Sequence, residues 1–265
     1  MEKRTAHGYI FPSCCHSQQD KANKNLPRQA CKFSNDVPSG TFIKPPKGGF
    51  FLGRPWQLAP ANLIEYSLRM PTKHLDLGCG AVPRNPYQRD ELYAVDLVVP
   101  DGSDPSRFRE ANLSLEPIPF PDNTFDSVSA FDFFEHVPRI LNTAEGKLGT
   151  RFPFIELMDE IHRVLQPGGH LYALTPAYPS PEAFQDPTHV NTITDGTWRY
   201  FCGQAPMARM YGFSGTFQLL RNEWALHPEA FSARTEMKLL RRLKRWRKDR
   251  AGRLSHLMWE FRAEK

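Results

Sequence analysis

Residues 74–80, His-Leu-Asp-Leu-Gly-Cys-Gly, constrain the fold more than any other part of the sequence. Leucines flank Asp76, and Gly78 and Gly80 follow closely. A short apolar run of this kind is typical of a buried parallel strand, and glycines at its end allow a tight turn in which a ligand can touch the backbone. The stretch therefore predicts a parallel α/β sheet with a ligand site at the carboxyl end of this strand.

A second apolar run, residues 92–96, ends in Asp96. This run predicts the next strand of the sheet. A carboxylate at its end suits a ribose diol, because its oxygens can accept hydrogen bonds from both hydroxyl groups. Together the two runs indicate a cofactor that contains adenosine.

The residues after the glycines distinguish between adenosine cofactors. A dinucleotide fingerprint needs a third glycine, but Pro83 stands there, and residues 84–86, Arg-Asn-Pro, do not open a helix. S-adenosylmethionine has no phosphate and does not need that glycine. Asp76 would lie near its amino-acid moiety, whereas a pyrophosphate would be repelled. The sequence favours S-adenosylmethionine over NAD.

Four blocks in order resemble the class I S-adenosylmethionine-dependent methyltransferases, and most closely the small bacterial enzymes called type 11. The blocks are residues 75–80, 93–96, 119–137 and 163–169. The resemblance extends from about residue 61 to the C-terminus. It implies a Rossmann-like α/β fold: a doubly wound, mostly parallel seven-stranded sheet with helices on both faces and the last strand antiparallel. It also implies methyl transfer from S-adenosylmethionine.

The residues expected at the cofactor form two groups. Those that the strand ends indicate are Asp76, Gly78 and Gly80 at the methionine end and Asp96 at the ribose. Those that the resemblance implies are Leu97 against the adenine, Asn112 and Leu113 at the adenine edge, and Phe131 closing the pocket. Asn112 departs from the aspartate common in the family, but its amide can still hydrogen-bond adenine. Phe131 could equally be a plain core aromatic.

Periodicity predicts several further elements. A short helix is expected over residues 63–68 and a buried strand over 125–131. Apolar residues from Phe154 to Leu165 fall at helical spacing, and Pro167-Gly-Gly169 is typical of a helix stop. Extended segments are expected at residues 170–175, 216–220 and 255–261. Strands that alternate with helices favour a parallel sheet.

We expect residues 1–45 to be a loose, polar, proline-dotted tail and residues 46–265 to be the methyltransferase domain. The chain carries no secretory signal and no apolar run near the roughly 20 residues that span a bilayer. Five irregularly spaced cysteines, with no C-x-x-C, indicate neither disulfides nor a zinc site. We therefore expect a cytoplasmic protein, a monomer or homodimer, without a metal.

The loop after the strand at 170–175 is the expected acceptor site. It is proline-rich and carries Tyr178, Asp186 and His189, followed by Trp198 and Tyr200. Titratable groups beside aromatics at the carboxyl edge of a parallel sheet resemble an acceptor pocket. His189, or His136 just after the strand at 125–131, is the candidate base. Equally, Asp186 and His189 could brace the loop, and His136 could bond only to backbone.

Residues 238–253 form a basic segment with leucines and a tryptophan on one helical face, within a predicted helical insertion at about 234–253. Three interpretations stay open: a solvated helix packed on the body, contact with an anionic membrane or lipid-linked acceptor, and contact with nucleic acid. Enzymes that methylate amino groups of bases carry a signature of the Asn-Pro-Pro-Tyr type after their fourth strand. The segment after the strand at 125–131 lacks it, so no firm nucleic-acid partner is expected.

The sequence thus predicts methyl transfer to a small molecule or to a sugar unit of a glycan or glycolipid precursor, with oxygen as the first choice of acceptor atom. One alternative is an RNA or other nucleic-acid methyltransferase that uses the basic helix. The other is a catalytically silent scaffold that binds the cofactor.

Overall fold

The computed structural model describes residues 70–144, 149–225 and 254–265, and the positions 227, 231, 233, 243, 246–248, 250 and 252. The predicted tail of residues 1–45 and the helix expected at 63–68 lie outside these residues. Within the described part of the chain, no helix is long and apolar enough to cross a membrane.

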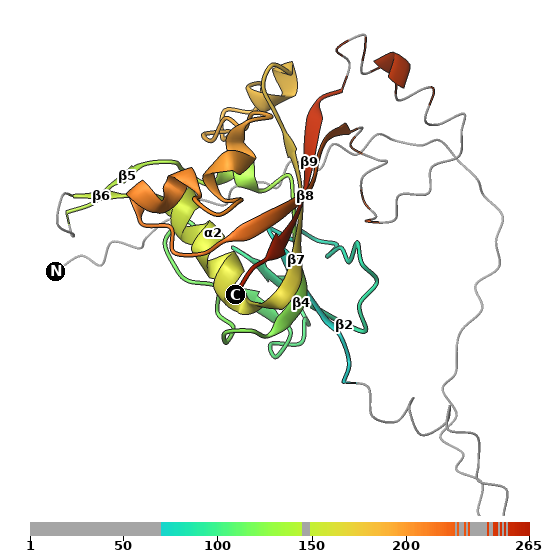
Figure 1. The fold of residues 1–265 in the computed structure, drawn as a ribbon. Helices are drawn as coiled ribbons and strands as arrows, with labels where there is room; N and C mark the ends of the chain where they lie inside the picture. Colours follow the sequence, from blue (N-terminus) through green and yellow to red (C-terminus); the bar gives the residue numbers. More distant parts are fainter. Residues whose placement is uncertain are drawn as a thin grey trace, which may run out of the picture. The chain divides into compact units, whose positions relative to one another are not determined.

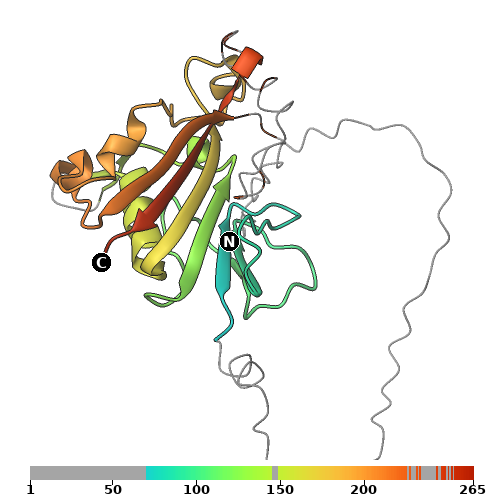
Figure 2. The same ribbon diagram turned by 45° about the vertical axis from the view of Figure 1, so that its right-hand side comes forward.

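Seven strands form one sheet in the order β3-β2-β1-β4-β7-β9-β8 (Figures 1 and 2). Their bounds are β1 Lys73–Leu77, β2 Glu91–Asp96, β3 Phe108–Glu110, β4 Phe125–Phe131, β7 Leu165–Pro176, β8 Phe217–Ala225 and β9 His256–Ala263. Parallel pairings join the strands from β3 to β7, and β9 pairs antiparallel with both β7 and β8. The fold is the predicted Rossmann-like, mostly parallel α/β sheet with its last strand antiparallel.

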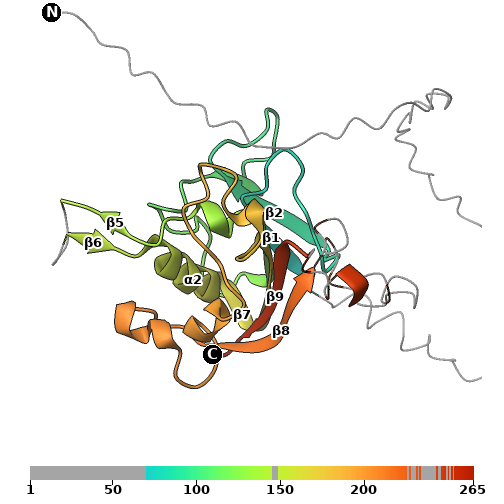
Figure 3. The same ribbon diagram turned by 90° about the horizontal axis from the view of Figure 1, so that it is seen from above.

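Helix α2 (Pro153–Val164) covers one face of the sheet (Figures 1 and 3). Proline suits the first turn of a helix because no intrahelical partner is available for an N–H there. The buried side chains of α2 recur every three or four residues, and they are Phe154, Leu157, Met158, Ile161 and Val164. They join the main core, which also takes apolar side chains from β1, β4, β7 and β9.

The prediction that the helix ends at Pro167-Gly-Gly169 was wrong. Helix α2 ends at Val164, and β7 begins at Leu165, which pairs with Phe125. The register between β4 and β7 then shifts before Ser127 pairs with His170. The residues between are therefore an irregularity within β7, and Gly168 lies there at a φ of 76°.

The connections between the first four strands contain no α-helix, although all of their residues are described. Proline interrupts each of them: Pro83 and Pro86 in the first, Pro100 and Pro105 in the second, and three prolines in the third. Proline removes an N–H donor and disfavours the helical conformation of the residue before it. Of the helices that the fold class places on both faces, the described residues thus supply α2 on one face.

Several shorter elements lie outside the seven-stranded sheet. Within the continuously described ranges, four 3-10 turns occur: η1 Phe134–His136, η2 Pro181–Ala183, η3 Thr197–Tyr200 and η4 Met207–Tyr211. A two-stranded ribbon joins β5 (Leu141–Asn142) to β6 (Thr150–Arg151). Phe201 and Phe213, which flank η4, belong to the main core, so this part of the chain packs on the α2 face.

Candidate active site

Asp76 is buried at the face of the sheet opposite α2, with a relative exposure of 2%. Its Oδ2 accepts a hydrogen bond from the backbone N–H of Arg84 at 2.8 Å, and its Oδ1 accepts one from the hydroxyl of Ser129. Burial raises the pKa of Asp76 to about 7, against these hydrogen bonds, which lower it. The carboxyl group is therefore poised between its two protonation states near neutral pH.

A polar chain behind Asp76 was not predicted from the sequence. His74 is fully buried, and its two ring nitrogens hydrogen-bond Ser127 and Ser129, each at 2.8 Å. Burial lowers the pKa of His74 to about 3, so the ring is neutral. Because Ser129 donates to Asp76, the imidazole must donate to Ser129 and accept from Ser127. The sequence signal that could have revealed this chain is the alternation of polar residues along β1 and β4, because alternate side chains of a strand point to the same face of the sheet.

The predicted glycine turn follows β1 directly. Gly78 and Gly80 have φ values of 63° and 55°, in the left-handed region that favours glycine. A Cβ atom on Gly78 would lie 2.5 Å from Cδ2 of Phe133, so this position cannot take a side chain without a shift. The N–H of Gly80 donates to Oδ2 of Asp96 at 2.7 Å. The turn after β1 and the end of β2 are therefore joined.

Asp96 also accepts a hydrogen bond from the N–H of Leu97, at 2.6 Å from its other oxygen. Each carboxylate oxygen can accept two hydrogen bonds, so both keep capacity for hydroxyl donors. The side chain of Leu97 is 54% exposed. The contacts of Asp96 with a ribose and of Leu97 with an adenine stay predictions.

The other three predicted cofactor residues lie in more packed surroundings. Asn112 accepts the N–H of Ser114 on its side-chain oxygen at 3.1 Å, as in an Asx turn. Leu113 is a member of the main core. Phe131 is 3% exposed and packs against Tyr172, with 5.8 Å between ring centroids. Their contacts with a cofactor stay predictions.

At the carboxyl edge, the structure brings together His136, His189 and Asp186. The two imidazole rings meet edge to face with 4.8 Å between centroids, and Nε2 of His189 lies 4.0 Å from Asp186. Thr188 links Asp186 to His136, because its hydroxyl donates to Asp186 at 2.6 Å and lies 3.0 Å from Nδ1 of His136. Burial, followed by the charge of His189, lowers the pKa of His136. His136 is therefore a neutral imidazole at neutral pH.

Glu135, to which the sequence assigned no role, belongs to this cluster. A carboxylate oxygen of Glu135 and one ring nitrogen each of His136 and His189 lie within 4.8 Å of one another. Glu135 is 1% exposed and accepts a hydrogen bond from the hydroxyl of Thr175 at 2.9 Å. Burial, then the charge of Asp132, raises the pKa of Glu135 to about 8. Its backbone oxygen accepts the N–H groups of Val190 and Asn191, so the predicted acceptor loop is fastened to η1.

The remaining predicted acceptor residues are spread along the same loop. Tyr178 is 56% exposed, and its N–H donates to the carbonyl of Ile193 at 2.9 Å. Trp198 packs against the main core, and Tyr200 ends η3 with partial exposure. No ring-to-ring contact between these aromatic side chains and the histidine pair occurs among the described residues. Their role at an acceptor stays a prediction.

The predicted basic helix is described at a few positions only. Residues 243, 246–248 and 250 are helical, and Leu243 and Trp246 are 48% and 51% exposed. The guanidinium carbon of Arg250 lies 5.0 Å from the centre of the Trp246 ring. The apolar side chains at these two positions therefore face solvent, and contact with an anionic surface stays a prediction.

A family model described as a methyltransferase domain matches residues 75–173, which run from β1 to the middle of β7. The matched residues form a methyltransferase domain. The described part of the chain has the predicted fold of a class I S-adenosylmethionine-dependent methyltransferase. Its activity is methyl transfer, and its cofactor is S-adenosylmethionine, as predicted.

Solved structures of methyltransferases are similar to the chain at low identity. One belongs to the complex between the Trm112 methyltransferase activator and a methyltransferase of Haloferax volcanii: 13% identity, 75% of this chain and 84% of that chain, TM-score 0.44. A second is an S-adenosylmethionine-dependent methyltransferase from Archaeoglobus fulgidus: 14% identity, 76% and 91%, TM-score 0.40. A third is the 1,6-didemethyltoxoflavin-N1-methyltransferase of Burkholderia thailandensis: 16% identity, 77% and 76%, TM-score 0.38. No relative of the chain was found among curated proteins.

The methyltransferase site has the donor and acceptor groups that S-adenosylmethionine needs. A buried carboxyl group, Asp76, stands at one strand end, and the Asp96 carboxylate stands at the next. Carboxylates are suitable partners for an ammonium group and for a ribose diol. Between them lies a turn of two glycines in left-handed conformation. The residues present therefore fit the cofactor.

Proposed function

We propose that this methyltransferase transfers a methyl group to a hydroxyl oxygen of a small molecule or of a sugar unit in a glycan or glycolipid precursor. The observation that supports this proposal is the His136–His189 pair on the carboxyl edge. A hydroxyl acceptor loses a proton during methylation and benefits from a positioned base, whereas a neutral amine needs little help.

We assign the cofactor contacts as follows. Asp76 would hold the ammonium group, with Gly78 and Gly80 against the methionine end, and Asp96 would accept hydrogen bonds from the ribose. Leu97, Asn112, Leu113 and Phe131 would surround the adenine. When bound, S-adenosylmethionine supplies an electrophilic methyl group on a sulfonium. The task of the protein is then to orient the acceptor and to exclude water.

The histidine pair would take the acceptor's proton. His136 is neutral, because its pKa is lowered, and can therefore accept a proton. Its Nδ1 is linked to Thr188, so Nε2 is the atom free to act toward the acceptor. His189 lies edge-on to it with its Nδ1 buried and unpartnered among the described residues. Tyr178, Asp186, Trp198 and Tyr200 would form the rest of the acceptor site.

The test combines product analysis with two single variants. Purified protein is incubated with methyl-labelled S-adenosylmethionine and a panel of hydroxyl, amine and carbon-acid acceptors, including sugar nucleotides and membrane extracts. We expect the label on oxygen. His189→Ala and His136→Ala should lower kcat by about 100-fold or more, with S-adenosylhomocysteine affinity within about twofold. Equal losses of kcat and cofactor affinity would show that the histidines only brace the loop, and label on nitrogen or carbon would refute the acceptor atom.

A further inference from the structure

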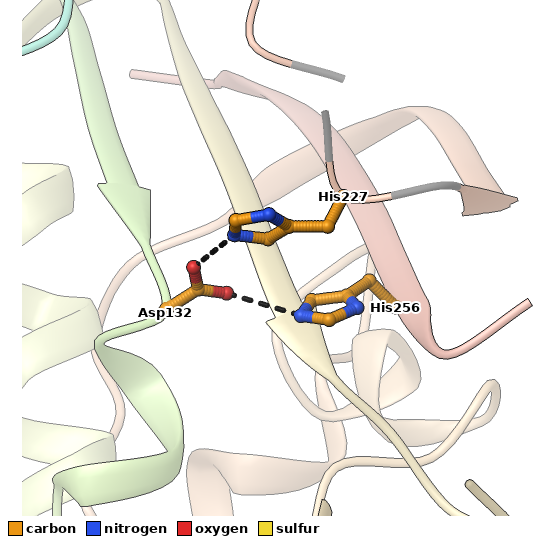
Figure 4. Close-up of side chains that lie close together, drawn as sticks. All are labelled: Asp132, His227 and His256. Atoms are coloured by element: carbon orange, nitrogen blue, oxygen red, sulfur yellow. Dashed lines mark hydrogen bonds and ion pairs between the residues drawn. The ribbon is translucent and has the colours of Figure 1, made fainter. Parts of the chain in front are cut away.

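Three side chains from distant parts of the sequence converge on the same edge of the sheet (Figure 4). Asp132 follows β4, His227 follows β8, and His256 is the first residue of β9. Nε2 of His256 lies 3.2 Å from Oδ1 of Asp132, and Nε2 of His227 hydrogen-bonds Oδ2 of the same carboxylate. Their candidate ligand atoms all lie within 4.8 Å of one another.

The topology explains why these three residues meet. Strands β4 and β7 are parallel and end at the carboxyl edge, and β9 runs against β7, so β9 begins at that edge. Pro176 of β7 is paired with His256. Asp132 has a φ of 50°, a left-handed conformation that aspartate tolerates better than most residues. The arrangement is thus held by strand ends as well as by loops.

The orientation of the side chains in the cluster suits a cation. The two carboxylate oxygens of Asp132 each lie beside Nε2 of one histidine, so the three side chains present their candidate ligand atoms to one another. Nδ1 of His256 lies 2.7 Å from the Ser255 hydroxyl, which fixes the ring with Nε2 toward Asp132. A second hydrogen bond of this kind is typical of histidines that bind metals.

We propose that Asp132, His227 and His256 bind one divalent transition-metal ion, such as Zn²⁺ or Mn²⁺. Two imidazoles and one carboxylate suit these ions, and three protein ligands leave coordination positions open. An acceptor oxygen bound there would lose its proton more easily, because the cation stabilises the alkoxide. This part of the inference rests on the proposed oxygen methylation, whereas metal binding itself does not.

The position of the cluster matches an acceptor site. Asp132 precedes Phe133, whose ring lies where a side chain on Gly78 would be, so the cluster is next to the cofactor turn. Ser255, which hydrogen-bonds His256, lines a cavity of about 490 Å³ together with Glu182 and Trp224. The cluster is therefore connected through Phe133 to the cofactor turn and through Ser255 to a cavity that can admit a small molecule.

The neighbouring cluster of Glu135, His136 and His189 is a weaker candidate for a metal. Its ligand atoms also lie within 4.8 Å of one another. Glu135, however, is 1% exposed and hydrogen-bonded to Thr175. The Asp132 side chain is 34% exposed, so an ion can reach it from solvent. Of these two clusters, the Asp132 cluster therefore offers the more accessible carboxylate.

The experiment is a metal titration of the full chain after treatment with a chelator, with no acceptor present. Co²⁺ is added first, because its visible absorption reports coordination, and Zn²⁺ is used to displace it. The variants are Asp132→Asn, His227→Ala and His256→Ala, with His189→Ala in the neighbouring cluster as the matched control. The melting temperature and S-adenosylhomocysteine affinity of each variant show whether it is folded; His227, whose side chain is 37% exposed, is the safest to replace.

We expect one equivalent of Co²⁺ per chain and its displacement by Zn²⁺. His227→Ala should lower the metal affinity by well over about 10-fold while S-adenosylhomocysteine still binds, and His189→Ala should change neither. No metal binding by the folded protein, or equal binding by the folded His227→Ala variant, would overturn the proposal. Metal binding without oxygen methylation would refute the proposed acceptor atom alone, so the two failures can be told apart.

Discussion

The backbone N–H of Gly80 donates a 2.7 Å hydrogen bond to the carboxylate of Asp96. This bond joins the turn after β1 to the end of β2, so Asp96 has two tasks. It shapes the glycine turn, and it presents its remaining lone pairs at the sheet edge. A variant that removes the side chain loses both, whereas a variant that keeps an acceptor oxygen loses mainly the charge.

Asp96→Ala should weaken binding of S-adenosylmethionine and S-adenosylhomocysteine by about 10- to 100-fold, since a hydrogen bond to a charged group contributes about 1.5–3 kcal/mol. Asp96→Asn should weaken binding of both ligands less, because its amide oxygen can still accept the hydrogen bond from Gly80. Calorimetric titration gives both affinities. Asp101→Ala, at an exposed carboxylate, is the control. If Asp96→Ala binds both ligands as the natural chain does, the ribose assignment is wrong.

Cofactor binding should release protons through Asp76. The pKa of this carboxyl is about 7 in the free protein, so below pH 7 it is mostly protonated. A cationic ammonium group favours the ionised form, and binding therefore expels the proton. Affinity should rise with pH up to about 7 and then level off.

Calorimetry at about pH 6 in buffers of different ionisation enthalpy measures this proton release. Asp76→Asn serves as the control, because it cannot titrate. An observed enthalpy that is the same in all buffers, or proton release that persists in Asp76→Asn, would show that Asp76 does not meet the ammonium group.

The strands were the most predictable part of the fold. Phe125–Phe131 was predicted with its observed bounds, because it is a short run with apolar residues at 125, 128, 130 and 131 that follows a clear turn signal. The end of α2 was not, since Leu165 fits helical spacing and yet begins β7. Local spacing cannot distinguish the two cases. Pairing of Leu165 with Phe125, a tertiary contact, decides between them.

The same reasoning applies to the site. Asp76 and Asp96 end neighbouring parallel strands, so their proximity follows from the strand order. The His136–His189 contact joins two irregular segments, and no periodicity predicts it. Asp132 meets His256 only because β9 inserts beside β7 in the antiparallel direction. The strand itself is predictable from its extended sequence pattern, but nothing local to His256 predicts that it meets a carboxylate, and no metal was expected.

Gly78→Ala should destabilise the protein more than Gly102→Ala does. Both glycines have positive φ values, of 63° and 79°, so both pay for the backbone conformation. An added Cβ meets Phe133 at 2.5 Å at Gly78 and nothing within 4 Å at Gly102. Urea unfolding should show a loss of about 1–2 kcal/mol for Gly102→Ala and about 1–3 kcal/mol more for Gly78→Ala. Equal losses would mean that Phe133 moves aside at little cost.

Glu135→Gln should change how stability depends on pH. The pKa of Glu135 is raised from 4.5 to about 8 in the folded protein, so folding favours its protonated form. The resulting contribution to the free energy of unfolding is complete below pH 4.5 and is lost as pH rises through about 8. Glutamine is neutral throughout and can still accept the hydrogen bond from Thr175.

The natural chain should therefore lose about 2–4 kcal/mol relative to Glu135→Gln between about pH 5 and pH 9. Urea unfolding of both proteins at several pH values measures this difference, and every other titrating group cancels because the two chains share it. Parallel pH curves would mean that Glu135 keeps an ordinary pKa. The carboxylate would then be ionised beside Asp132 at neutral pH.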